Sequence, residues 1–479
     1  MQELLFTRNR FRLLLDAERQ DRRTNKGGGW TEPHLWLRIA LKEAGRDPAE
    51  VVVPPRSGSR HAQAISDLSV FEDAYRIMER LVAGGRKDLQ VLWGELCIEK
   101  AVVHSETGDL GGAEALYDRA IETYERLVIQ KGDQECRYHL ATAYMNKAEL
   151  VSQCGDVRNA VRLIDQAIEL RERLVNQEHR QEFSDDLAAA YMNKVVMLLG
   201  LGENVSAETL CRSAIEILER LVKMEGRQEL AQALATAYIN TSGVFMATGD
   251  NRTAMSFVDR AIEIRERLAK QGGLQESVYL ATAYVNKALA LSRLGGKRRA
   301  LEINELAIEI LERLVIREGQ LEFRNHLATA YKHKAIGLIA LGDNWGSIEF
   351  FDRAIELLER LVKQEGIREI EGDLARTYIG KANVLSAVEN HRAALDLYDN
   401  AIEIYQRMVG HEGRQELFGE LGTFKAYRAT TLINLGERMR GLSEGFAAMA
   451  DLKAEVARTG RADLQAVLNW LTDNFRSIS

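Results

Sequence analysis

Few residues in this 479-residue chain have types and spacings that could do chemistry, and none forms a complete set. Cys136 and His139 are three residues apart, so on a helix they would share a face and could act as metal ligands or as nucleophile and base. The pair occurs once, and no second pair completes a metal site. Gly295-Gly296-Lys297 lacks the preceding glycine of a phosphate-binding loop, and no GxSxG or HExxH motif occurs. The sequence therefore predicts no catalytic centre, no metal site, no cofactor and no enzyme activity.

Asparagine recurs at four equivalent positions, which we call the asparagine row: Asn146, Asn193, Asn240 and Asn286. Asparagine does not favour a helix interior, so four copies there suggest a function. An amide both donates and accepts, so the row could bind the backbone of an extended peptide without selecting its side chains. The alternative is that the amides bond within their helix or to a neighbouring repeat. We predict a peptide- or partner-binding site formed by the row and its neighbours Thr142, Met145, Met192, Ile239 and Val285.

The row lies within an internal repeat that fills most of the chain. Segments similar to LATAYMNKA begin at residues 93, 140, 187, 234, 280, 327, 374 and 421, with the first and last copies diverged. The spacing is 47 residues, except for 46 between the copies at 234 and 280. In the second copy, Leu140, Tyr144 and Ala148 follow helical periodicity, and Gly155-Asp156 ends that helix before a second one. Each copy is therefore predicted to form two helices.

The outer face of the second helix is predicted to carry ion pairs four residues apart. Such pairs on an exposed helix contribute about 0.2–0.5 kcal/mol each. They are Glu122–Arg126, Glu169–Arg173, Glu216–Arg220, Glu263–Arg267, Glu309–Arg313, Glu356–Arg360 and Glu403–Arg407. We interpret them as a solvated helix surface.

Small residues at fixed separations, Ala148, Ala160 and Ala167 with Gly155-Asp156 between the helices, resemble the tetratricopeptide repeat (TPR) motif. The resemblance implies an all-α fold, a right-handed α-solenoid of about eight TPR-like helix pairs with N- and C-terminal capping helices. The period of 47 departs from the usual 34, so both helices should be longer, with the second continuing through ERLVxxEG. The asparagine row resembles the peptide-binding ladder in the TPR domains of O-GlcNAc transferase and kinesin light chain.

The predicted organisation has three parts. Residues 1–60 hold two short amphipathic helices, FRLLLDAERQ and HLWLRIALKEAG, in an N-terminal extension or cap with a Gly- and Pro-containing linker. Residues 61–457 form the repeat array, and residues 458–479 form a C-terminal capping helix. All four prolines lie in the first 55 residues, so nothing after them forbids long helices.

Composition narrows the class of protein. The chain carries 64 Lys and Arg against 71 Asp and Glu, a net charge of −7, which argues against a nucleic-acid-binding role. Four cysteines without a dense pattern indicate a reducing compartment, and the arginines that interrupt the N-terminal apolar stretch argue against a signal peptide. We therefore expect a cytoplasmic, non-membrane scaffold or adaptor that binds a protein segment in a concave groove. The alternative is a regulatory or sensor subunit whose enzyme, for example a caspase-like peptidase, is a partner chain; the oligomeric state stays open.

Overall fold

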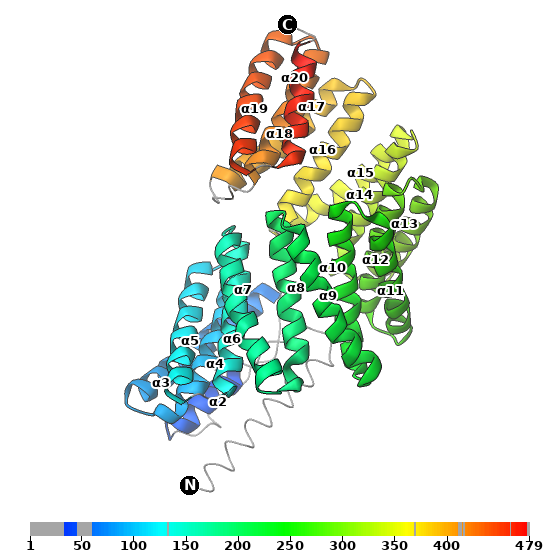
Figure 1. Ribbon diagram of the computed structural model, residues 1–479. Helices are drawn as coiled ribbons and strands as arrows, with labels where there is room; N and C mark the ends of the chain where they lie inside the picture. Colours follow the sequence, from blue (N-terminus) through cyan, green and yellow to red (C-terminus); the bar gives the residue numbers. More distant parts are fainter. Residues whose placement is uncertain are drawn as a thin grey trace. The chain divides into compact units, whose positions relative to one another are not determined.

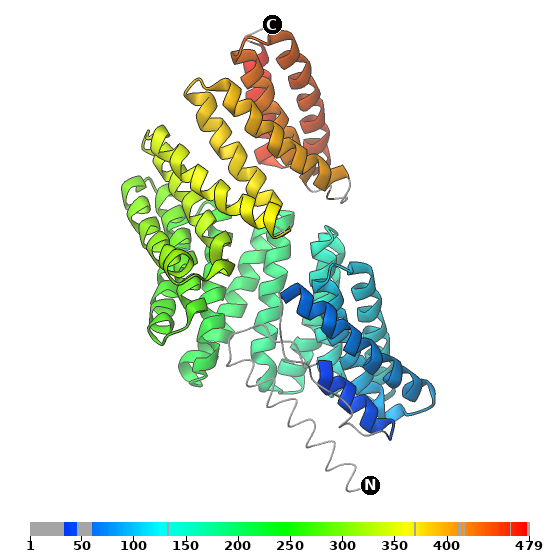
Figure 2. The same cartoon turned by 180° about the vertical axis from the view of Figure 1, so that it is seen from behind.

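The structure is a computed structural model that describes residues 33–45, 60–131, 134–367, 370–410, 414, 417–459 and 461–476. Every regular element in these residues is helical, and they contain no β-strand. The chain divides into two compact units, residues 1–240 and 241–479. The all-α prediction is confirmed (Figures 1 and 2).

The first unit contains eight described helices and the start of a ninth. They are α2 (Pro33–Glu43), α3 (Arg60–Ala83), α4 (Gln90–Glu106), α5 (Leu110–Lys131), α6 (Gln134–Gln153), α7 (Val157–Glu172), α8 (Ser184–Leu201), α9 (Asn204–Glu219) and α10 (Ala231–Thr248). From α2 to α9, each helix packs against the next one in the chain. Helices α4, α6 and α8 are the first helices of their copies, and first helices of adjacent copies also touch.

The second unit contains the rest of α10 and ten further helices. They are α11 (Asn251–Lys270), α12 (Leu274–Arg293), α13 (Lys297–Glu312), α14 (Arg324–Ala340), α15 (Asn344–Glu359), α16 (Glu371–Ala387), α17 (His391–Gly410), α18 (Phe418–Asn434), α19 (Arg438–Thr459) and α20 (Ala462–Arg476). From α11 onward successive helices again pack pairwise. Each copy of the sequence repeat is thus a pair of helices, as predicted.

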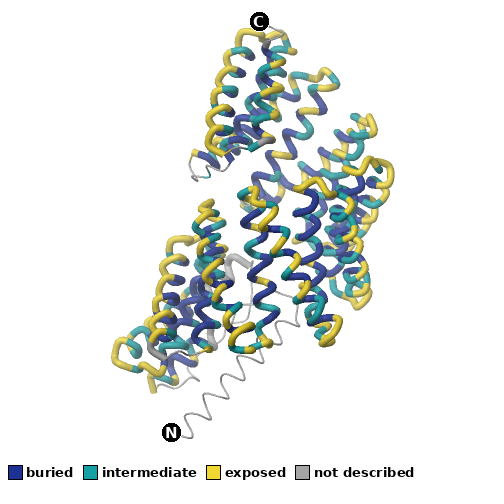
Figure 3. Tube along the Cα trace, viewed as in Figure 1, coloured by how far each residue is buried: buried dark blue, intermediate teal, exposed yellow. Residues whose placement is uncertain are grey.

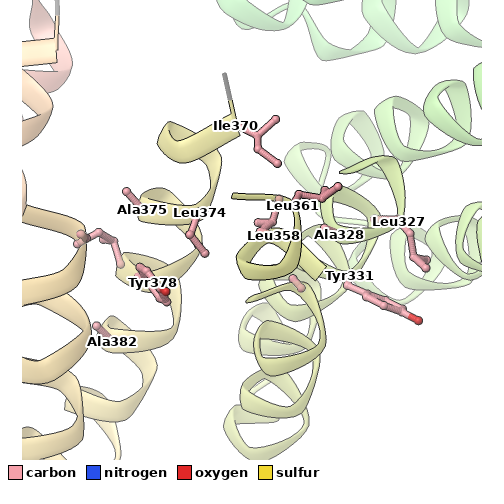
Figure 4. Packing of buried hydrophobic residues seen from close by; sticks show 14 of the residues in the cluster. Leu327, Ala328, Tyr331, Leu358, Leu361, Ile370, Leu374, Ala375, Tyr378 and Ala382 are labelled. Carbon is pink, nitrogen blue, oxygen red and sulfur yellow. The ribbon is translucent and has the colours of Figure 1, made fainter. Parts of the chain in front are cut away.

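The helices bury one face and expose the other (Figure 3). The small residues Ala148, Ala160 and Ala167 are fully buried, because only a methyl group fits where two helix backbones approach closely. In the second unit, one cluster of buried residues joins successive copies and contains Leu327, Tyr331 and Leu358 together with alanines such as Ala328 and Ala375 (Figure 4). Stability is therefore distributed along a series of similar interfaces.

The turn between the two helices of a copy has the predicted chemistry. Gly155 has φ of 89°, in the left-handed region that glycine adopts without strain. The Asp156 carboxylate accepts a hydrogen bond from the Asn159 backbone N–H at 3.1 Å, and thereby caps the next helix. Asp250 and Asp343 cap α11 and α15 in the same way.

One copy has a residue other than glycine in this turn, which allows the contribution of the glycine to stability to be tested. Glu389 occupies the glycine position with φ of 63°, whereas Gly342 at the same place in the preceding copy has φ of 86°. A side chain in this conformation costs about 1–2 kcal/mol, partly offset by the greater freedom of glycine in the unfolded chain. We expect Glu389→Gly to raise the free energy of unfolding by about 0.5–1 kcal/mol, measured by urea denaturation. Gly342→Ala, whose new methyl group would meet no atom within 4 Å, should lower it; equal stabilities would contradict the backbone argument.

Four of the second helices end in a π-helical turn. Helices α7, α9, α13 and α15 each continue into a π-helical turn, Arg173–Gln177, Arg220–Met224, Arg313–Arg317 and Arg360–Gln364. A π-turn accommodates one residue more than an α-turn. Helix α11, in the 46-residue copy, stays α-helical to Lys270. Helices α5 and α17 also end as α-helices.

The predicted ion pairs form in one of the four copies that have a π-turn, and the arginines of the other three have different partners. Of the seven Glu–Arg pairs four residues apart, Glu356–Arg360 forms at 2.6 Å. Arg173, Arg220 and Arg313 instead approach the glutamate five residues further on, at 3.4–3.6 Å. Residues five apart point in different directions on an α-helix, whereas in a π-turn residues i and i+5 lie one above the other. These charged side chains still pair on the outer face of the second helices, but three of the arginines have a different glutamate as partner.

Helices also cover the two ends of the array. Helix α2 packs on α3 and buries Trp36 completely, and it corresponds to the second predicted amphipathic segment. The first segment, FRLLLDAERQ, lies outside the described residues. Helix α20 packs on α19 and α18 through Leu464, Leu471 and Phe475.

Candidate functional site

The asparagine row lies on an exposed stripe of the first helices. The third, seventh and tenth residues of a copy share one helix face, and we call this face the exposed stripe. On α8 it consists of Ala189, Asn193 and Val196, and the Val196 side chain is 58% exposed. The four asparagines of the row are each half-buried. Asn146, Asn193 and Asn240 belong to the first unit, whereas Asn286 belongs to the second.

A tyrosine two residues before each asparagine fixes the first helix to the preceding second helix. The Tyr191 hydroxyl donates to Glu172 at 2.6 Å. Burial raises the pKa of Tyr191, with a further contribution from Glu172, so the phenol stays protonated as a donor. The pair recurs in six copies: Tyr144–Glu125, Tyr191–Glu172, Tyr238–Glu219, Tyr284–Glu266, Tyr331–Glu312 and Tyr378–Glu359.

The residue after each asparagine forms a second fixed contact. Lys194 pairs with Asp165 at 2.6 Å, and Lys287 pairs with Asp259 at 2.7 Å. Equivalent pairs are Lys147–Asp118, Lys334–Glu305, Lys381–Asp352 and Arg428–Asp399. The copy that begins at Leu234 departs from the pattern, because Thr241 replaces the lysine.

Together these contacts set the rotation of each first helix. Residues two apart on an α-helix differ by about 160° in direction, so an asparagine faces away from the helix to which its tyrosine is bonded. In the described part of the chain, no hydrogen bond involves the side chain of Asn146, Asn193, Asn240 or Asn286. The alternative that the amides bond within the array is therefore not what this structure contains. Their donors and acceptors face solvent.

The apolar neighbours of the row differ in exposure. Met145 and Ile239 are half-buried, whereas Met192 and Val285 are 8% and 7% exposed. The latter two pack beneath the stripe, so the predicted apolar strip is open only in part. Thr142 is half-buried and already bonded, donating to the Tyr138 carbonyl at 3.1 Å and accepting from Arg171 at 3.4 Å.

The pair Cys136 and His139 has a structural role. Cys136 is fully buried, and His139 stacks on Tyr124 with ring centroids 5.4 Å apart. The Nε2 atom of His139 lies 3.1 Å from a carboxylate oxygen of Glu95. Among the described residues, no group of three or more His, Cys, Asp or Glu side chains could hold a metal ion.

Two hollows lie on the same stripe in the second unit, where other residues replace asparagine. One, of about 370 Å³, is lined by residues of α14, α15 and α16, including Lys332, Ile336, Phe351 and Gly380. Gly380 takes the asparagine position there, and a Cβ atom would lie 2.7 Å from the Phe351 ring. The other hollow, of about 600 Å³, is lined by residues of α16, α17, α18 and α20.

Sequence reasoning missed the tyrosine–glutamate and lysine–aspartate pairs. Their signal was present, because both partners recur in register, 18 or 19 residues apart for the first pair and 29 residues apart for many of the second. The hollows left no such signal, since their linings come from helices distant in sequence.

Comparison with known protein families identifies the type of repeat in three segments of the chain. The sequence profile described as "Tetratricopeptide repeat" matches residues 99–128, 140–181 and 374–415, which are helix pairs in this structure. These three segments match tetratricopeptide repeats. The matched TPR segments lie in both units, and the copies between them share their helix pairing. No curated protein matches the sequence.

The solved structures that match this chain share little sequence with it. BtubC from P. vanneervenii is 21% identical, with a TM-score of 0.42 over 53% of this chain and 92% of its own. The apo form of RapI is 14% identical, with a TM-score of 0.48 over 80% and 97%. A signal-transduction ATPase with a TPR sensor from Pyrococcus horikoshii is 13% identical, with a TM-score of 0.45 over 91% and 65%.

In the part of the chain that the structure describes, no helix is long and apolar enough to cross a membrane.

Proposed function

We propose that this TPR protein is a non-enzymatic scaffold or adaptor that binds an extended segment of a protein partner along the exposed stripe of its first unit. The observation that carries the proposal is the set of partly exposed amides of Asn146, Asn193 and Asn240, which have no hydrogen-bond partner within the described chain. An amide side chain that bonds only to water can exchange that water for a peptide backbone. Because the helix that carries it is already packed in place, binding costs little conformational entropy. The helices are already held in rotation by their tyrosine and lysine contacts.

The spacing suits a peptide backbone. Packed helices lie about 8–10 Å apart, and three residues of extended chain span about 10 Å. One asparagine per copy therefore meets the partner backbone at every third residue. Each amide can donate to a carbonyl and accept from an N–H, which gives affinity with little dependence on the partner's side chains.

Binding through the peptide backbone can be tested by changing the backbone of the bound peptide. We would select binders from a random-peptide display library on the intact protein and resynthesise one with single amide-to-ester replacements along its length. An ester removes one N–H donor and leaves the side chains unchanged. We expect affinity, measured by fluorescence anisotropy, to fall about two- to tenfold at every third position. Loss that follows side-chain substitutions instead, with no effect of the esters, would contradict the proposal.

A further inference from the structure

The larger hollow of the second unit has an uncharged, aromatic lining. It occupies about 600 Å³, within the range of ligand-binding pockets. None of its lining residues carries a charge, and they include Asn383, Tyr398, Tyr427, Asn434, Val467 and Trp470. The rings of Tyr427 and Trp470 pack edge to face with centroids 5.5 Å apart, and Trp470 is 38% exposed. Because Val467 and Trp470 belong to α20, the terminal helix forms a wall of this hollow in addition to covering α18 and α19.

The polar groups of the hollow divide into bonded and open ones. The Tyr398 hydroxyl donates to Asn383 at 2.6 Å, and Thr431 donates to the Tyr427 carbonyl at 3.0 Å. The Tyr427 hydroxyl, the Trp470 indole N–H and the Asn434 side chain make no hydrogen bond within the described chain. Burial raises the pKa of Tyr427, so its hydroxyl stays protonated. The open groups thus offer N–H or O–H donors from all three residues and acceptor oxygens from Tyr427 and Asn434 alone, set beside two aromatic rings.

This combination defines the chemistry of the occupant. A charged segment would lose hydration without gaining a counter-charge. A β-extended segment would bring N–H groups that need acceptors. A proline-rich segment offers carbonyl acceptors, no N–H at its prolines, and apolar rings that pack on aromatic side chains, in a helix that is preformed before binding.

We propose that this hollow binds a proline-rich segment of a protein partner, with Tyr427 and Trp470 as packing surfaces and as donors to its carbonyl groups. The site does not depend on the asparagine row, because its lining residues lie on α16, α17, α18 and α20.

The test uses the full chain and fluorescein-labelled acetyl-decaproline, followed by fluorescence anisotropy. Decaproline should bind saturably, and a decaserine peptide of equal length should not. Tyr427→Phe keeps the ring and removes one donor, and Trp470→Phe keeps an aromatic ring while it removes the indole N–H and part of the packing surface, so each should weaken binding about two- to tenfold. The control is Trp345→Phe, which changes an indole that is 73% exposed and outside the hollow, and should leave affinity unchanged.

Circular dichroism checks that each variant keeps its helical fold. Tyr427→Phe and Trp470→Phe, which we call the donor variants, test the proposal separately because each changes a different side chain of the hollow. Absence of saturable decaproline binding, equal binding of decaserine, or equal affinity for wild type and both donor variants would overturn the proposal. Weakening of decaproline binding by Asn193→Ala with Asn240→Ala would place the peptide on the asparagine row instead, and would overturn it as well.

Discussion

Replacing Asn193 and Asn240 together by alanine is expected to weaken binding of a selected extended peptide about 30- to 1000-fold. Each amide can supply two hydrogen bonds, and at about 0.5–1 kcal/mol net for each bond the pair should account for roughly 2–4 kcal/mol. Neither side chain has a hydrogen-bond partner within the described chain, and alanine is the better helix former. The melting temperature should therefore hold or rise slightly. Peptide affinity by anisotropy and melting by circular dichroism, on the same variant, check both parts.

Asn204→Ala is the matched control. This asparagine is also half-buried and lies in the first unit, but at the start of α9 and outside the exposed stripe. It should leave peptide affinity unchanged. A double variant at Asn193 and Asn240 that loses stability and keeps full affinity would show that the amides are structural, and the proposed binding site would then be wrong.

Removing the carboxylate of Glu276 is expected to cause the largest loss of stability. Glu276 is 1% exposed and accepts from Arg265, which is 3% exposed, at 3.0 Å between Nη1 and Oε2. Burial lowers the pKa of Arg265, and the hydrogen bond to Glu276 opposes this. Without this carboxylate the buried guanidinium would lose the counter-charge that lies 3.0 Å away. Glu276→Ala should therefore lower the free energy of unfolding by about 3–5 kcal/mol, measured by urea denaturation with hydrogen exchange across α11 and α12.

The other copies supply the control for this pair. The positions of Arg265 and Glu276 hold Leu218 and Leu230 one copy earlier, and Leu311 and Phe323 one copy later. Arg265→Leu with Glu276→Leu should thus restore stability to the wild-type level or above it, because well-packed apolar pairs often replace buried ion pairs without cost. If the double variant were as unstable as Glu276→Ala, the loss would come from packing and not from the unpaired charge.

The sequence alone determined the repeat and the local structure within it. Its 46- to 47-residue period, the apolar spacing around Tyr144 and the Gly155-Asp156 break specify helix pairs, because helix periodicity and capping depend on residues close together in the chain. The same register identified the asparagine row. The sequence pattern did not mark the π-turn that begins at Arg173, nor the approach of Arg173 to Glu178 five residues further on.

Tertiary structure decided which partners those residues have. The Tyr191 hydroxyl reaches Glu172 on the preceding helix, and Lys194 reaches Asp165 on that helix. The exposure of Asn193, the burial of Met192 and the hollow beside Trp470 likewise depend on how helices from different copies pack. The physical reason is that local periodicity fixes which face of a helix is apolar, whereas hydrogen-bond partners and hollows depend on side chains brought together from separate helices.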